Sequence, residues 1–293
     1  MLRFDSISEL LAACEERGLP LWKVALQEQA LQMEVAEEAI IERMQESLQV
    51  MLQSAKEGMK PGLRSVSGLS GGDGLKMETY FASGSALSGG FLARAAAIAL
   101  GIMEYNAAMG KIVAAPTAGS CGILPAGIIA MMEQRQTSEE EAARALVTAG
   151  AVGLVISHRA TLAGAEGGCQ AECGSAAAMT AAALVELAGG HPKASANAVA
   201  FALQNLMGLV CDPVAGLVEV PCILRNACGI SVAVNSADMA LAGMESRIPV
   251  DEVIAAMGEV GRAMPESLKE TALGGLAATP TGVAIRERLF GAL

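Results

Sequence analysis

The chain has 293 residues, with 31 acidic against 20 basic side chains, 53% hydrophobic residues and 3% aromatic residues. Its formal net charge of −11 excludes the basic surface that nucleic-acid binding needs, so no nucleic-acid partner is expected. Because aromatic residues are scarce, the core must be filled by Ala, Leu, Val, Ile and 16 Met, a composition that suits closely packed helices.

Two uncharged stretches, residues 112–132 and 194–211, approach the length of a membrane span. The first contains Pro116 and Pro125, and the second contains Asn197 and further amides, so we interpret both as buried segments of a soluble protein and expect no membrane partner. The N-terminus lacks the apolar core of a signal peptide. Together with seven cysteines and no targeting signal, this predicts a reducing, cytoplasmic setting.

The N-terminal part predicts helices. Ser6 and Glu9 form a capping box, and the short helix that follows should stop near Gly18. Residues 21–57 then predict a long amphipathic helix, continuous or interrupted, which Gly58 ends. Its apolar stripe favours packing on the core over a dedicated partner-binding surface.

Two loops rich in small residues follow. Residues 62–74 form a Gly/Ser loop in which backbone N–H groups and the hydroxyls of Ser67 and Ser70 can meet an anion, although a flexible linker fits the residues equally well. A helix is expected over residues 91–108. The loop over residues 116–122 can bind a small polar ligand, and a tight capped turn is an equal alternative.

Helices are predicted for the remainder of the chain. They should run from about 138 to 158, over 174–188, over 194–209 and from 222 to about 242, and Pro249 and Pro265 should each begin a later one. No segment shows sustained period-two alternation, so the predicted fold is all-α. We expect one domain over residues 1–293, with N-terminal helices over 1–60 and a core over 61–293.

Three cysteines stand at breaks between predicted helices. Cys169, Cys211 and Cys222 each lie beside Gly or Pro or within two residues of one, where helix N-termini can offer N–H groups to an anionic cluster or carboxylate. A lone cysteine is usually a small buried hydrophobe, and we expect this of Cys14 and Cys228. His158 and His191 show no ligand spacing, which disfavours zinc. The residues alone leave a metal site open.

The segments GAEGGCQAECGSA (164–176) and CDPVAGLVEVPCILRN (211–226) resemble the iron–sulfur L-serine dehydratases, specifically the alpha chain of the two-subunit type. The segments AAPTAGSCGILPA (114–126) and SGLSGGDG (67–74) fit the same family. The resemblance runs from about Ser65 to the 270s. It implies conversion of L-serine to pyruvate and ammonia with a [4Fe-4S] cluster whose open iron acts as a Lewis acid.

Site residues follow from the resemblance. It implies that Cys169, Cys211 and Cys222 hold the cluster, with Cys173 the nearest substitute and Cys121 a motif residue. The implied substrate-binding residues are Ser67, Gly68, Ser70, Gly71, Gly72, Thr117, Gly119 and Ser120. The catalytic base is unassigned among the motif acids Glu166, Glu172, Asp212 and Glu219. It can also come from a separate beta chain, which in the family carries a Ser-Ser-Ser-His-Thr segment absent here.

The sequence departs from the family at one position and leaves alternatives open. Arg159 stands before Ala160-Thr161 where the family often has a neutral amide, which bears on nearby substrate contacts. A pyridoxal-phosphate lyase would need a lysine, and Lys76 follows the glycine-rich loop. A non-enzymatic iron–sulfur redox or partner protein is the other alternative, and L-threonine or L-cysteine could replace L-serine as substrate.

Overall fold

The structure, a computed structural model, describes residues 4–291 and is all-α, as predicted. Helix α1 (Ile7–Arg17) begins where the Ser6 side chain accepts the Glu9 N–H, and it ends at Gly18 in the left-handed conformation. The long amphipathic segment is interrupted: α2 (Leu21–Met33) ends at Glu34 with φ of 54°, and α3 (Glu37–Gly58) follows.

The remaining elements form a bundle of helices joined by short turns. The helices are α4 (Asp73–Ala82), α5 (Gly89–Ala107), α6 (Ile123–Arg135), α7 (Glu139–Arg159), α8 (Gly164–Gly167), α9 (Ser175–Leu187), α10 (Pro192–Leu206), α11 (Cys222–Leu241), α12 (Val250–Ala263) and α13 (Pro280–Phe290). A π-helical turn spans Gln170–Gly174, and 3₁₀ turns span Ala118–Ser120, Val214–Gly216, Glu266–Leu268 and Gly275–Ala278. No strand occurs within residues 4–291.

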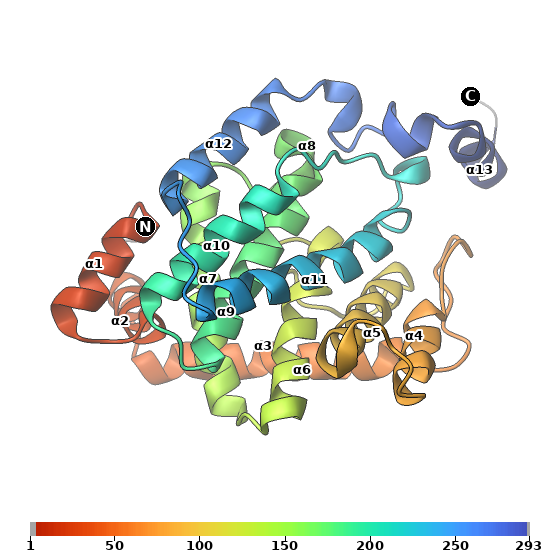
Figure 1. The fold of residues 1–293 in the computed structure, drawn as a ribbon. Coiled ribbons are helices and arrows are strands. Elements are labelled where there is room, and N and C mark those ends of the chain that lie inside the picture. Colours follow the sequence, from red (N-terminus) through yellow and green to blue (C-terminus); the bar gives the residue numbers. More distant parts are fainter. Residues whose placement is uncertain (1–3, 292–293) are drawn as a thin grey trace.

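Helix α9 is the centre of the core. Its residues 175–185 are all buried, and most are Ala, so the neighbouring helices α7, α10 and α11 can approach its backbone closely. Figure 1 shows α1 and α2 at one end of the molecule, α4 and α5 at the other, and α3 running between them. A second apolar cluster packs α1 and α2 against Val147 and Ala151 of α7. These helices hold the loops that follow α8, α10 and the 3₁₀ turn Val214–Gly216.

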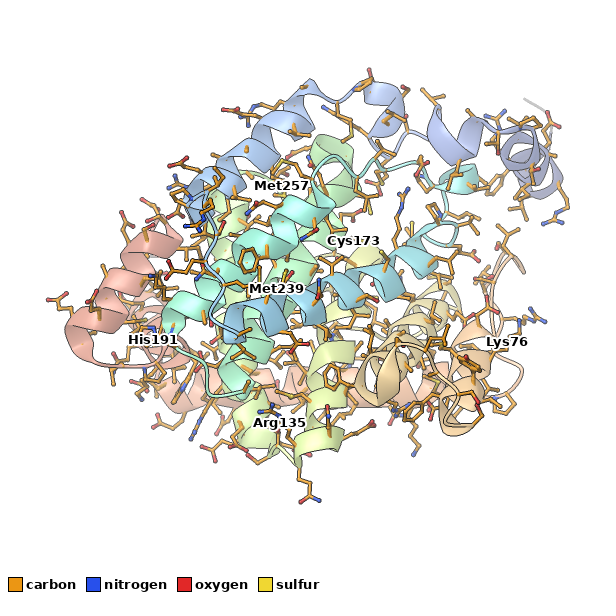
Figure 2. The ribbon with its side chains drawn as sticks, viewed as in Figure 1. Lys76, Arg135, Cys173, His191, Met239 and Met257 are labelled. Carbon is orange, nitrogen blue, oxygen red and sulfur yellow. The ribbon has the colours of Figure 1, made fainter. Side chains whose placement is uncertain are left out.

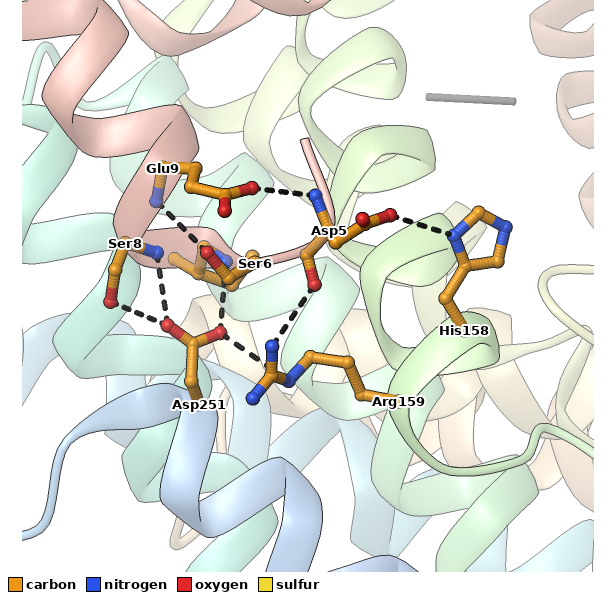
Figure 3. Close-up of polar contacts among 8 residues, drawn as sticks. Asp5, Ser6, Ser8, Glu9, His158, Arg159 and Asp251 are labelled. Carbon is orange, nitrogen blue, oxygen red and sulfur yellow. Dashed lines mark hydrogen bonds and ion pairs between the residues drawn. The ribbon is translucent and has the colours of Figure 1, made fainter. Parts of the chain in front are cut away.

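The start of α1 is fixed by a residue far along the chain. The Asp251 carboxylate accepts the N–H groups of Ile7 at 2.9 Å and Ser8 at 3.0 Å, which satisfies donors that have no partner inside the helix. Arg159 donates to the Asp5 carbonyl at 3.2 Å and lies 4.0 Å from Asp251 (Figure 3). The arginine that departs from the family pattern therefore joins α7 to α1 and α12.

Three sequence predictions need correction or completion. Pro265 begins only the 3₁₀ turn Glu266–Leu268, because the chain there turns back to pair with Cys211. Cys228 is exposed on α11, whereas Cys14 is buried as expected. Helices α4, α6, α8 and α13 were not predicted. As for membrane spans, none of the helices between residues 4 and 291 has the length and hydropathy to cross a bilayer.

Candidate active site

The structure brings the three predicted cysteines and Cys173 together. Cys169 precedes the π-helical turn, Cys211 lies in the loop after α10, and Cys222 is the first residue of α11. Their exposed fractions are 2%, 3% and 8%. The Cys173 thiol lies 3.4 Å from the Cys169 sulfur, at four residues' spacing in the same turn. Such π-helical turns occur often at functional sites.

The cysteines interact electrostatically. A hydrogen bond from Cys173 lowers the pKa of Cys169 against the opposing effect of burial, and the nearby Arg225 adds to this. Burial raises the pKa of Cys222 to about 12, with contributions from the negative charges of Cys169 and Glu172. Burial and the same two charges also raise the pKa of Cys211. Cys211 and Cys222 thus both lie close enough to Cys169 for its charge to raise their pKa values.

Backbone hydrogen bonds tie Cys211 to a distant segment. Its N–H donates to the Leu268 carbonyl at 2.8 Å, and its carbonyl accepts the Glu270 N–H at 2.8 Å. The neighbouring Asp212 is 3% exposed and pairs with Arg225 at 2.7 Å, while its second oxygen accepts the Leu276 N–H at 2.7 Å. Asp212 therefore has a structural role in this site.

The loop over residues 116–122 lies against the cysteines. Asn226 donates to the carbonyls of Gly119 at 2.8 Å and Cys222 at 2.9 Å, and its own oxygen accepts the Gly122 N–H at 2.9 Å. Thr117 donates to Glu172 at 2.7 Å. Ser120 is buried and closes a capping box with Thr117. Three of the predicted substrate residues, Thr117, Gly119 and Ser120, therefore lie in a loop that Asn226 joins to Cys222.

Glu172 lies between this loop and Cys211. A Cβ on Gly119 would stand 3.0 Å from Glu172, so a larger residue would require the carboxylate to shift by a few tenths of an ångström. The Cys211 thiol is 3.9 Å from the other carboxylate oxygen. Burial raises the pKa of Glu172, against the lowering effect of the Thr117 hydrogen bond.

The Gly/Ser loop over residues 62–74 contacts the segment that leads into α11. Ser67 donates to one Glu219 oxygen at 2.6 Å, and Ser70 donates to the other at 2.5 Å. Gly68, Gly71 and Gly72 all have positive φ, of 74°, 133° and 92°, which accounts for glycine at these positions. The loop is therefore ordered by Glu219, which tells against a flexible linker.

A cavity of about 560 Å³ opens beside this contact. Ser67, Glu219, Asn106 and Ala118 line it, so it touches both loops. The rest of its wall is apolar and consists of Val66, Ala107, Met109, Leu217, Val218, Leu289 and Phe290. The size is ample for a small amino acid.

Several candidate residues lie elsewhere. The Lys76 side chain is 78% exposed and pairs with Asp73 at 2.7 Å, so it is not placed for a buried Schiff base (Figure 2). His191 accepts the Lys193 N–H at the start of α10, and His158 lies 4.0 Å from Asp5. Glu166 is exposed and accepts a hydrogen bond from Thr161. Neither histidine is close to the four cysteines.

Arg225, Asn226 and the serine contacts of Glu219 were not predicted from the sequence. Arg225 and Asn226 fall inside the 211–226 motif, and the spacing of four between Cys222 and Asn226 on a helix was the available signal. Across residues 4–291, no three His, Cys, Asp or Glu side chains converge tightly enough for a single metal ion. A polynuclear cluster is wider than one ion, and its cysteine ligands stand farther apart.

Comparison with known proteins identifies the family. Residues 16–277 match the family described as "Serine dehydratase alpha chain". The chain is 48% identical over 288 residues to the "Probable L-serine dehydratase, alpha chain" of Bacillus subtilis, covering 98% of this chain and 96% of the relative. It is 46% identical over 282 residues to the "L-serine dehydratase, alpha chain" of Peptoniphilus asaccharolyticus, covering 96% and 97%.

A longer relative matches in part. The "L-serine dehydratase 2" of Escherichia coli is 46% identical over 182 residues, which is 61% of this chain and 40% of that protein. The family match covers most of the chain, including the cysteine motifs and both loops. The chain therefore belongs to the serine dehydratase alpha chain family.

Proposed function

We propose that this chain, together with a partner chain, converts L-serine to pyruvate and ammonia, and that Cys169, Cys211 and Cys222 hold a [4Fe-4S] cluster. The observation that carries this proposal is the meeting of three buried thiols from segments 42 and 11 residues apart in the sequence. The names of the relatives, all L-serine dehydratases, support the reaction.

The donor set fits an iron–sulfur cluster. Cysteine thiolates are the usual ligands of such clusters, and three of them leave one iron without a protein ligand. Cys173 is only 3.4 Å from Cys169, which suits a hydrogen-bond donor to the ligand sulfur better than a ligand on another iron. When bound, the cluster supplies an open iron that acts as a Lewis acid toward the serine hydroxyl.

The chain's own residues organise the surroundings of the reaction. Asn226 holds the 116–122 loop against Cys222, and Thr117 holds the Glu172 carboxylate beside Cys211. Of the four motif acids, Glu166 is exposed and Asp212 is ion-paired with Arg225. The other two, Glu172 and Glu219, lie against the two loops. Fixed polar groups of this kind need little reorganisation when charge develops.

A separate beta chain is part of the proposal. The two alpha-chain relatives match nearly end to end, whereas the match covers 40% of the longer L-serine dehydratase. More than half of the longer protein therefore lies outside the matched region. This supports the proposal that a second chain supplies the corresponding region here. No histidine of this chain's described part lies at the cysteines, so an imidazole base would come from that partner.

The test is a metal and product analysis of the complex purified without oxygen. Iron and sulfide should be present at about four each per alpha chain, and L-serine should yield pyruvate and ammonia in equal amounts. Cys169→Ser, Cys211→Ser and Cys222→Ser should each lose iron and the visible absorbance of the cluster. The matched controls Cys14→Ser and Cys228→Ser should keep both. A Cys211→Ser protein with full iron content would refute the ligand set.

A further inference from the structure

Among the buried acids of residues 4–291, Glu219 differs in having neither a basic partner nor backbone N–H donors for its carboxylate. It is 5% exposed, and its hydrogen-bond donors are the neutral hydroxyls of Ser67 and Ser70. None of the ion pairs formed within residues 4–291 includes it. A buried carboxylate without a compensating charge is costly, so this one calls for an explanation.

The other buried acids all have such compensation. Glu28 pairs with Arg17, and Asp212 pairs with Arg225. Glu104 accepts two N–H groups at the start of α4, and Asp251 accepts two at the start of α1, where a helix dipole favours negative charge. Within the described part of the chain, Glu219 has neither a basic side chain nor a set of helix N–H donors within hydrogen-bonding distance.

The carboxylate can be reached by a small molecule. It lines the 560 Å³ cavity together with Ser67 and Asn106, and Ala118 brings the second loop to the same space. A carboxylate has about four lone-pair positions, and the two serine hydroxyls occupy two. Two positions therefore remain for a ligand that can donate hydrogen bonds.

We propose that Glu219, held in place by Ser67 and Ser70, binds the α-ammonium group of the amino-acid substrate. This assignment rests on the proposed function and names the part of the site that recognises the amine. An ammonium group carries three N–H donors, no acceptor and a full positive charge, so it supplies both the missing charge and the missing donors. Hydroxy acids that lack the amine gain nothing from Glu219, so the site selects amino acids.

The experiment compares two ligands on the reconstituted complex with its partner chain. L-serine is measured by its KM and by calorimetric binding. 3-Hydroxypropionate, which has the same hydroxyl and carboxylate but no amine, is measured as a competitive inhibitor. In Glu219→Gln the binding of L-serine should weaken by about 10- to 100-fold, the range for a lost charge-assisted hydrogen bond. The inhibition constant of 3-hydroxypropionate should change by no more than about twofold, because the variant removes only the partner of the amine.

Controls separate recognition from structure. Glu104→Gln alters another buried carboxylate next to the same loop, and it should affect both ligands by the same factor. Should Glu219→Gln not fold, Glu219→Asp keeps the charge one methylene farther away and should show a smaller loss that is still selective for L-serine. An equal loss for both ligands, or none, would overturn the assignment while the wild-type complex still produces pyruvate. Absence of pyruvate from the wild type would count against the proposed function. The role of Glu219 would then be decided separately, by comparing how Glu219→Gln changes the binding of L-serine and of 3-hydroxypropionate.

Discussion

The Asp212–Arg225 ion pair is a buried charged contact beside Cys211 and Cys169. Asp212→Asn should lower the free energy of unfolding by about 2–4 kcal/mol, because the variant leaves the Arg225 charge without its partner. The Leu276 N–H can still donate to the asparagine oxygen, so the loss reflects mainly the charge. Denaturant unfolding, followed by circular dichroism, measures it.

An exposed ion pair provides the control for this variant. Lys193 and Glu245 lie 2.6 Å apart with most of both side chains in solvent. Solvent screens such a pair, so Glu245→Gln should leave the unfolding midpoint unchanged. Equal effects of the two substitutions would show that burial does not decide the contribution of the Asp212 pair.

Glu186 makes stability depend on pH. Burial raises its pKa above the ordinary value, against the lowering effect of a hydrogen bond from Thr148. Because the folded-state pKa is the higher one, the folded protein holds the proton more tightly. The resulting stabilisation is complete below the unfolded-state pKa and is lost as pH rises through the folded-state value.

Glu186→Gln should therefore remove this dependence. The wild type should lose stability relative to the variant as pH rises from about 4 to 7, so the two should differ most near neutrality, where the buried wild-type carboxylate is charged. Thermal midpoints of both proteins across this range give the answer. If the wild type instead gained stability relative to Glu186→Gln as pH rises, that result would contradict a raised pKa for Glu186.

Among the elements, α3, α4 and α5 cross where three glycines meet. A Cβ on Gly58 would stand 2.2 Å from the Gly101 carbonyl oxygen, and one on Gly74 would stand 2.6 Å from the Gly101 nitrogen. Both contacts are to backbone, which cannot move aside as a side chain can. This crossing holds α4, and with it the end of the 62–74 loop, against α5.

Gly58→Ala should consequently destabilise the protein by about 1–3 kcal/mol, the usual effect of overpacking. Gly150→Ala is the matched variant, because Gly150 lies within α7 and an added Cβ there meets no atom within 4 Å. That substitution should stabilise by about 0.5–1 kcal/mol, the difference in helix propensity. Chemical denaturation of both proteins tests the pair, and a neutral Gly58→Ala would mean that the helices can separate at no cost.

Local signals predicted some elements and missed others. The Ser6 cap and Gly18 gave α1 accurately, since both ends of that helix are set by adjacent residues. The start of α4 is satisfied by Glu104, which is about 30 residues away, so no local cap revealed the helix. The chain breaks at Glu34, which adopts the left-handed conformation although it is not a glycine, so no residue type marked the break. Pro265 leads into a turn whose position is set by pairing with Cys211, far away in the sequence.

In the site, motifs identified the cysteines and the loops, but the contact of Ser67 with Glu219 spans 152 residues and has no sequence signature.

At the scale of the whole molecule, we expect the proposed beta chain to decide the activity. The isolated chain, loaded with iron and sulfide, should turn over L-serine about 100-fold or more slowly than the complex, the factor that a positioned acid or base contributes. The comparison uses the chain purified alone and co-expressed with its beta chain, at equal iron content. Equal rates would place the base among this chain's own carboxylates and remove the need for a partner in the chemistry.

The pairing of Cys211 with residues 268–270 also sets an order of events during synthesis. On the proposed ligand set, all three cysteines are synthesised before the segment that fixes Cys211 and Asp212. At ordinary elongation rates the delay from Cys222 to Leu276 is roughly 3–10 s. During that interval the nascent chain contains its cysteines but not the residues that tether Cys211. Delivery of iron and sulfide therefore meets either an untethered Cys211 loop or, after residues 268–270 have paired with it, a loop already held in place.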